Sequence, residues 1–228
     1  MNLELLQTYG WMMIQGLWVT IQLVVISTCV GALIAVPLAL ARISNSRILR
    51  GLSFGYSYLF RGTPLLAQLF LVYYGSGQFR PFFDSIGLWW LFRSAFFCAA
   101  LTFTLNIAAY QAEIFRGAIK AVPRGQTEGA LALGLHPMQA FLTVTLPQAF
   151  RLALRPLGND IVINIKGSAV AAIVTVHDLM GVTRLAFSKT YDISAYLYAA
   201  VLYLVLVETL RRSWDALERR LTRHLHRP

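Results

Sequence analysis

Long apolar segments dominate the pattern of hydrophobic and polar positions along the chain. No charged side chain occurs within residues 17–41 or within residues 94–112. A helix rises about 1.5 Å per residue, so roughly 20 apolar residues are needed to cross the hydrocarbon core of a bilayer. The pattern therefore predicts that each of these segments forms a membrane-spanning helix.

Three further segments are apolar but are interrupted by charged side chains. They are residues 52–79 with Arg61, residues 154–176 with Asp160 and Lys166, and residues 193–210 with Glu208. Charged groups at membrane depth usually face the interior of a helix bundle or a water-filled path, so they do not exclude membrane insertion. We therefore predict an all-α, polytopic membrane protein of about five transmembrane helices, in which residues 1–228 form a single transmembrane domain.

Composition and charge agree with this arrangement. Hydrophobic residues make up 57% of the chain and charged residues 13%, which is too apolar for a soluble surface around one core. The net charge of +10 could suit nucleic acid, but 15 of the 20 Lys and Arg residues would lie on one side of five spans. The positive-inside rule assigns that side to the cytoplasm. This predicts an external N-terminus, a cytoplasmic C-terminus whose basic residues meet anionic membrane lipid, and no nucleic-acid partner.

Motifs for catalysis, metal binding or nucleotide binding are absent from the sequence. The two cysteines, Cys29 and Cys98, fall inside predicted spans, where a lone thiol is usually a packing residue. The histidines lack metal-site spacing, and no Gly-rich loop of the GxxxxGK[ST] kind occurs. We therefore predict no catalytic residue, no metal and no cofactor, and any use of ATP would require a partner chain.

The character of the sequence changes in residues 125–147, after the third span. This segment is mildly amphipathic and each part of it is too short to cross a membrane. Gly134 suits the end of a helix, and Pro137 suits the first position of the next one. The segment is therefore predicted to form two short helices joined by a turn on the cytoplasmic face. The alternative is an interfacial helix that rests on lipid, but such helices favour a Lys- or Arg-rich polar face, which is missing here.

This segment resembles the cytoplasmic signature of the type I permeases of binding-protein-dependent, ATP-driven importers, in particular the polar and basic amino-acid group. The signature is Glu-Ala-Ala, three residues, Gly, nine residues, and Ile-x-Leu-Pro. The chain matches it at Glu128, Gly129, Ala130, Gly134, Val144, Leu146 and Pro147, with Gly129 replacing Ala and Val144 replacing Ile. The resemblance implies that these residues couple the permease to its ATPase.

Three more signatures of the amino-acid group occur in the same order along the chain. They are Arg61-Gly62-Thr63-Pro64-Leu65-Leu66, Ala112-Glu113-Ile114-Phe115-Arg116-Gly117 and Leu157-Gly158-Asn159-Asp160. The resemblance extends over about residues 16–212. It implies a bacterial inner-membrane permease that pairs with a second identical or homologous permease, two ATP-binding subunits and an extracytoplasmic solute-binding protein. The solute would be a polar or basic amino acid or an opine-like derivative.

Polar residues within the predicted spans are candidates for the solute path. Asp160 could bind an ammonium or guanidinium group, while Asn164 and Gln68 could supply neutral hydrogen bonds. Pro64 is expected to kink its helix near the path. The alternative for Asp160 is a structural ion pair with Lys166. The residues after Lys166 depart from the group's usual pattern, so the identity of the solute stays open.

Other charged residues have simpler interpretations. Arg61 is expected to extend toward the cytoplasmic interface, and Glu113 and Arg116 to form a local ion pair. His177-Asp178 is expected to make a contact in an external loop. The competing function is a secondary transporter or channel that works without ATP, but such proteins often contain inverted repeats, and the sequence shows none.

Overall fold

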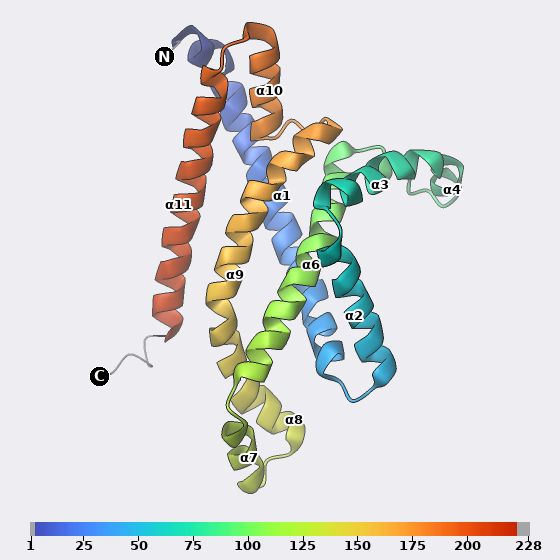
Figure 1. Cartoon of the computed structure of the whole chain (residues 1–228), viewed down its shortest axis with the longest axis vertical. Coiled ribbons are helices and arrows are strands. Elements are labelled where there is room, and N and C mark those ends of the chain that lie inside the picture. Colours follow the sequence, from blue (N-terminus) through green and yellow to red (C-terminus); the bar gives the residue numbers. More distant parts are fainter. Residues whose placement is uncertain (1–2, 223–228) are drawn as a thin grey trace.

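The computed structural model describes residues 3–222, and within this range the secondary structure is entirely helical (Figure 1). The elements are α1 (Leu3–Ile43), α2 (Arg47–Gly62), α3 (Leu65–Gln78), α4 (Arg80–Ser85), α5 (Trp89–Phe92), α6 (Ala95–Ala121), α7 (Arg124–Ala132), α8 (Pro137–Ala140), the π-helix η1 (Phe141–Thr145), α9 (Leu146–Ser168), the 3₁₀-helix η2 (Ala169–Val174), α10 (Leu179–Thr190) and α11 (Ser194–Thr222). The predicted all-α class is confirmed.

Four stretches in the described part of the chain are long and apolar enough to cross a membrane. They are 5–43, 95–121, 137–174 and 194–222, and they contain four of the five predicted spans. The fifth, residues 52–79, is divided into α2 and α3. Thr63 adopts an extended conformation before Pro64, as residues before proline prefer. The helix therefore breaks at Pro64, where the sequence predicts a kink.

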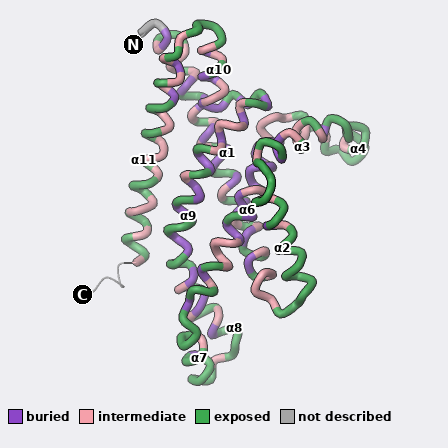
Figure 2. The backbone as a smooth tube through the Cα atoms, in the orientation of Figure 1, coloured by how far each residue is buried: buried purple, intermediate pink, exposed green. Residues whose placement is uncertain are grey.

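The long helices α1, α6 and α9 form the centre of the bundle, and α11 lies along its side (Figures 1 and 2). Their packing faces are built largely from small residues, which allow close approach of the backbones. On α1 and α6 these include Ala35, Ala39, Ala99, Ala108 and Ala112, all of which are fully or almost fully buried. The short helices α7 and α8 project at the opposite end of the bundle from α10 (Figure 1).

Because α1 and α6 are in close contact at Gly31, a larger side chain at this position is expected to destabilise the protein. A Cβ atom added there would lie 2.5 Å from Cγ2 of Ile107 and 3.4 Å from the backbone nitrogen of Ala108. Gly31→Val should therefore separate the two helices and lower stability by about 1–3 kcal/mol, the usual cost of overpacking. Thermal denaturation in detergent should show a lower midpoint. Gly55→Val is the control, because an added Cβ at Gly55 meets no atom within 4 Å, and an equal loss in both variants would contradict this reason.

Two regions hold structure that the sequence pattern does not reveal. Residues 75–93 contain Gly and Pro residues typical of a loop, but they form the end of α3 and the short helices α4 and α5, in which Phe83 stacks on Phe92 with ring centroids 4.1 Å apart. Asp178, expected as a loop contact, is completely buried. It caps α10 by accepting a hydrogen bond from the backbone N–H of Gly181 at 2.9 Å, so the contact that it makes is a helix cap.

Candidate functional site

A cavity of about 390 Å³ lies between α3, α6 and α9, beside the break at Pro64. Two predicted path residues, Asp160 and Asn164, line it from one face of α9, since residues four positions apart share a helix face. Its other lining residues are Leu65, Asn106, Ile107, Tyr110, Ile163 and Gly167. We call this space the α9 cavity.

Asp160 is the buried carboxylate of the α9 cavity. Its side chain is buried, and its Oδ2 atom has no hydrogen-bond partner among residues 3–222. Lys166 is exposed, and the ion pairs within this range do not include an Asp160–Lys166 pair. The structural ion pair considered from the sequence is therefore not formed. A buried carboxylate without a partner is costly unless a cation approaches it.

The two asparagines of the cavity already use their amide nitrogens as donors. Asn164 donates from Nδ2 to the hydroxyls of Ser27 and Thr28 on α1, at 2.9 and 3.3 Å. Asn106 donates from Nδ2 to the backbone oxygen of Phe60 and to Oε1 of Gln68, at 2.9 and 3.0 Å. The side-chain oxygens of both asparagines therefore remain available as acceptors.

Gln68 and Pro64 lie at the helix break and not among the residues lining the cavity. The Gln68 amide nitrogen donates to the backbone oxygens of Phe60 and Thr63 and to the Thr63 hydroxyl, at 2.7–3.1 Å. These bonds close the gap left by Pro64, and the bond from Asn106 joins the break to the cavity wall. Asn106 was not among the residues predicted for the path, although an amide within the apolar segment 94–112 was the available signal.

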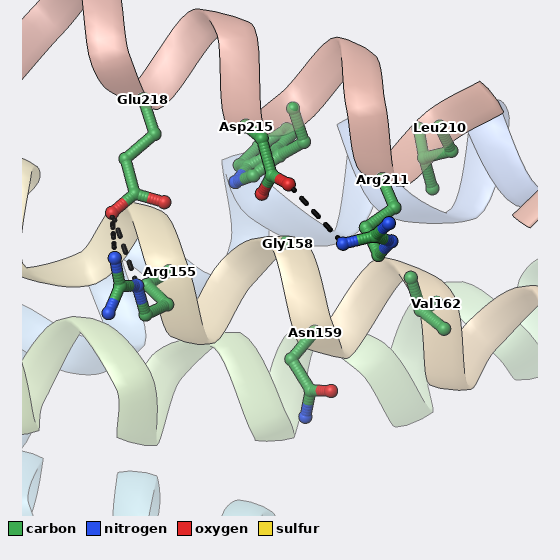
Figure 3. A pocket seen from close by; sticks show the side chains of 9 residues that line it. Arg155, Gly158, Asn159, Val162, Leu210, Arg211, Asp215 and Glu218 are labelled. Carbon is green, nitrogen blue, oxygen red and sulfur yellow. Dashed lines mark hydrogen bonds and ion pairs between the residues drawn. The ribbon is translucent and has the colours of Figure 1, made fainter. Parts of the chain in front are cut away.

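Two other residues of the Leu157–Asp160 signature, Gly158 and Asn159, line a separate pocket between α9 and α11 (Figure 3). A side chain at Gly158 would overlap the ring of Trp214, whose Nε1 donates to the backbone oxygen of Leu154 at 2.8 Å. Figure 3 shows ion pairs on either side of this contact, Arg155–Glu218 at 3.0 Å and Arg211–Asp215 at 3.6 Å. The glycine therefore serves packing, and Asp160 alone turns toward the α9 cavity.

The predicted turn in residues 125–147 is formed at Gly134, which has φ of +85°. The N–H of Leu135 donates to the oxygen of Ala130 at 3.2 Å, and the N–H of Gly134 donates to the oxygen of Leu131 at 2.9 Å. This is the Schellman pattern, which ends a helix at a left-handed residue. Pro137 occupies the first turn of α8, as predicted from the sequence.

The second helix of this segment differs from the prediction. α8 continues through the π-helix η1 directly into α9, so Leu146 and Pro147 begin α9. Proline is tolerated there because its missing N–H falls in the first helical turn. Thr127 and Thr145 form a hydroxyl hydrogen bond at 3.0 Å, which fastens α7 to the π-helix. The segment is thus a rigid extension of α9.

The surface of this segment is exposed and partly apolar. Leu133 is 86% exposed and Met138 is 61% exposed, and Glu128 is also exposed. Gly129 is exposed, while Ala130 is buried beneath this surface. Exposed apolar groups next to polar ones at one end of a membrane bundle are typical of an interface with another protein.

The predicted Glu113–Arg116 ion pair is present at 2.7 Å, and the structure adds a partner from α1. Arg42 lies 3.1 Å from the same carboxylate. Arg61 places its guanidinium over the ring of Tyr110, 5.2 Å from the centroid. The sequence did not predict these contacts because each joins residues far apart in the chain.

Comparison with known proteins gives one family. The model of "Binding-protein-dependent transport system inner membrane component" matches residues 27–223. The nopaline transport system permease protein NocM of Agrobacterium fabrum is 40% identical over 85% of this chain and 80% of its own length. The arginine ABC transporter permease protein ArtM of Haemophilus influenzae is 37% identical over 88% of both chains. The histidine/lysine/arginine/ornithine permease HisM of Salmonella typhimurium is 36% identical over 92% of this chain and 90% of its own.

Solved structures agree with the sequence relatives. A chain of an amino acid ABC transporter crystallised with histidines superposes with a TM-score of 0.86 at 31% identity, covering 96% of this chain and 99% of that one. A chain of the inward-facing MetNI methionine ABC transporter superposes with a TM-score of 0.77 at 22% identity, covering 93% and 97%, which supports the fold.

Proposed function

Since the chain belongs to the family of binding-protein-dependent transport system inner membrane components, we propose that it forms the translocation path of an ATP-driven importer for a cationic amino acid or an opine-like derivative. The family and the long apolar helices identify a multi-pass inner-membrane protein with a transport role and not an enzymatic one.

We assign a cationic solute because the polar groups available in the α9 cavity are mainly hydrogen-bond acceptors. Apart from the Tyr110 hydroxyl, which can donate or accept, the available polar groups are the Asp160 carboxylate and the amide oxygens of Asn106 and Asn164. Acceptors held in a buried space suit an ammonium or guanidinium group. Arginine, lysine and ornithine, which appear in the names of two relatives, each carry such a group. Gln68 and Pro64 would support the site by fixing Asn106.

The exposed surface of residues 125–147 supports docking of an ATP-binding subunit. Glu128 and Gly129 are exposed on this surface, and Ala130, Gly134, Leu146 and Pro147 shape it. A displacement of α7 would be transmitted to η1 through the Thr127–Thr145 hydrogen bond, and from η1 along α9 to Asp160. We assign two ATP-binding subunits, a second identical or homologous permease and an extracytoplasmic solute-binding protein as partners.

The connection between residues 125–147 and α9 suggests how the permease would alternate between its inward-open and outward-open states. ATP-bound and nucleotide-free partners would favour different orientations of α9, because a partner shifts a conformational equilibrium through its differential affinity for the two states. The permease would expose its acceptors to one side and then to the other. The chain supplies the path, while hydrolysis takes place on the partner subunits.

Orientation in the membrane is a separate prediction. The segments rich in Lys and Arg, including the end of α11, should face the cytoplasm, and the N-terminus should face outward. A fluorescent reporter that matures only in the cytoplasm should be bright when fused after Pro228. A dark fusion there, together with activity of a reporter that works only outside, would contradict this topology.

Co-purification tests the ATP-driven function. The tagged chain, expressed with the other subunits of its importer, should retain an ATP-binding subunit in mild detergent, and that complex should hydrolyse ATP faster when the loaded binding protein is added. A secondary transporter would instead purify without an ATPase and would transport solute alone. That result would overturn the proposal.

A further inference from the structure

A second cavity, of about 270 Å³, lies between α1, α2 and α6. Its lining residues are Arg42, Phe54, Ser57, Tyr58, Arg61, Gly62 and Glu113. Tyr110 lines the α9 cavity and Glu113 lines this one, three residues further along α6 toward α7. We call it the α2 cavity, and it follows the α9 cavity on the side of the predicted ATPase contact.

Two hydrogen-bond donors of the α2 cavity, the buried Ser57 hydroxyl and the exposed Arg61 guanidinium, have no acceptor among the residues that the structure describes. Ser57 is only 3% exposed, yet its hydroxyl has no hydrogen-bond partner among residues 3–222. A hydroxyl inside a helix can donate to the backbone oxygen four residues earlier, as Thr102 does to Cys98 at 2.8 Å. Arg61 contacts the Tyr110 ring, but no ion pair in the same range includes it.

The charge of the α2 cavity favours an anion. Its one carboxylate, Glu113, is shared by Arg42 and Arg116 at 3.1 and 2.7 Å. Arg61 then adds a further positive charge with a free fork of N–H donors. A guanidinium next to a hydroxyl suits a carboxylate or a phosphate, because both accept several hydrogen bonds at once.

The depth of the α2 cavity in the membrane distinguishes a solute carboxylate from a lipid phosphate as the bound oxyanion. At about 1.5 Å per residue, Ser57 lies roughly 15 Å along α2 from Arg47, and Arg61 lies roughly 21 Å along it. Lipid phosphates lie at the membrane surface, whereas charged residues at depth usually face a water-filled path. A carboxylate that moves through the bundle is therefore the better fit.

We propose that the α2 cavity is a subsite for the solute carboxylate, next to the α9 cavity and centred on Arg61 and Ser57. This inference rests on the proposed transport of a cationic amino acid. The two cavities have opposite chemistry, acceptors in the first and donors in the second, so together they match the two ends of such a solute. Tyr110 lines the α9 cavity and its ring contacts Arg61, so this contact must open for one solute to occupy both cavities.

Binding of L-arginine and of its methyl ester, which lacks the carboxylate charge, tests this subsite. The permease–ATPase complex is purified without nucleotide, and radiolabelled arginine is displaced by each unlabelled compound. The wild-type complex should bind the ester about ten- to a hundredfold more weakly than arginine, the effect of one charge-assisted hydrogen bond. The ratio of the affinity for arginine to the affinity for the ester should approach one in Arg61→Met. Ser57→Ala should lower this ratio by about threefold. Arg61→Lys, which keeps the charge, should retain part of the ratio.

The control experiments distinguish failure of the proposed subsite from failure of the proposed transport function. Arg47→Met should keep the wild-type ratio, because Arg47 lies outside the cavity, and Asp160→Asn should weaken both compounds while keeping the ratio. A wild-type ratio in folded Arg61→Met would overturn the subsite alone. Loss of co-purified phosphatidylglycerol from that variant with an unchanged ratio would assign the cavity to lipid phosphate and also overturn it. Absence of arginine binding to the wild-type complex would overturn the cationic-solute function and the subsite together.

Discussion

Replacing Gly134 by valine is expected to reduce solute uptake at least tenfold while the protein still inserts into the membrane at near-normal levels. Gly134 has φ of +85° at the end of α7, and a branched side chain at a positive φ costs about 1–2 kcal/mol. An added Cβ there meets no atom within 4 Å, so the strain would lie in the backbone and not in packing. The turn would open, and α7 would lose its fixed position on η1.

Uptake and ATP hydrolysis stimulated by the loaded binding protein, measured in reconstituted vesicles, check this result. Gly134→Asn is the matched control, because asparagine tolerates the left-handed conformation and should retain most of the uptake. Glu128→Arg should reduce uptake in a different way, by placing a like charge against a basic docking surface. Wild-type uptake and stimulated hydrolysis in both Gly134→Val and Glu128→Arg would exclude residues 125–147 as the coupling element.

The Asp160→Asn variant is expected to transport a cationic solute with an apparent affinity about ten- to a hundredfold lower. The substitution keeps the size of the side chain and removes its charge, which is equivalent to losing a charged hydrogen bond of roughly 1.5–3 kcal/mol. Folding should survive, because removing a buried charge without a partner also removes its desolvation cost.

A substrate titration of uptake measures the Asp160 effect. Asp84→Asn serves as the control, because Asp84 is exposed on α4 and its one ion pair within residues 3–222 is with Arg80, at 3.4 Å. The control should follow the wild-type curve. If Asp160→Asn followed it as well over the full range of solute concentrations, the carboxylate would have no part in solute binding.

The sequence predicted the features that depend on neighbouring residues. Charge-free segments located α1 and α6, and Gly134 with Pro137 located the turn between α7 and α8. Asp160 and Asn164, which the sequence offered as polar candidates within one span, line the same cavity from one face of α9. Each of these predictions depends on residues that lie close together in the sequence.

Contacts between distant segments could not be predicted in this way. Arg42 and Glu113 are 71 positions apart, and Gln68 and Asn106 are 38 apart, so only the packing of different helices brings each pair together. The same reason explains why Gln68 was assigned to the path and not to the helix break. Ser57 gave no signal at all, because an isolated serine in an apolar helix is ordinary in sequence and becomes informative only when its hydroxyl is seen without an acceptor.

Uptake of radiolabelled arginine into proteoliposomes, with ATP on the side of residues 125–147, would decide whether this chain is the path of an ATP-driven importer for cationic amino acids. The vesicles contain the permease, its ATP-binding subunits and the loaded binding protein on the opposite side. We expect accumulation of arginine that requires hydrolysable ATP, is lost in Gly134→Val, and needs higher arginine concentrations in Asp160→Asn. Accumulation of arginine that proceeds equally without ATP, or without the ATP-binding subunits, would contradict this function.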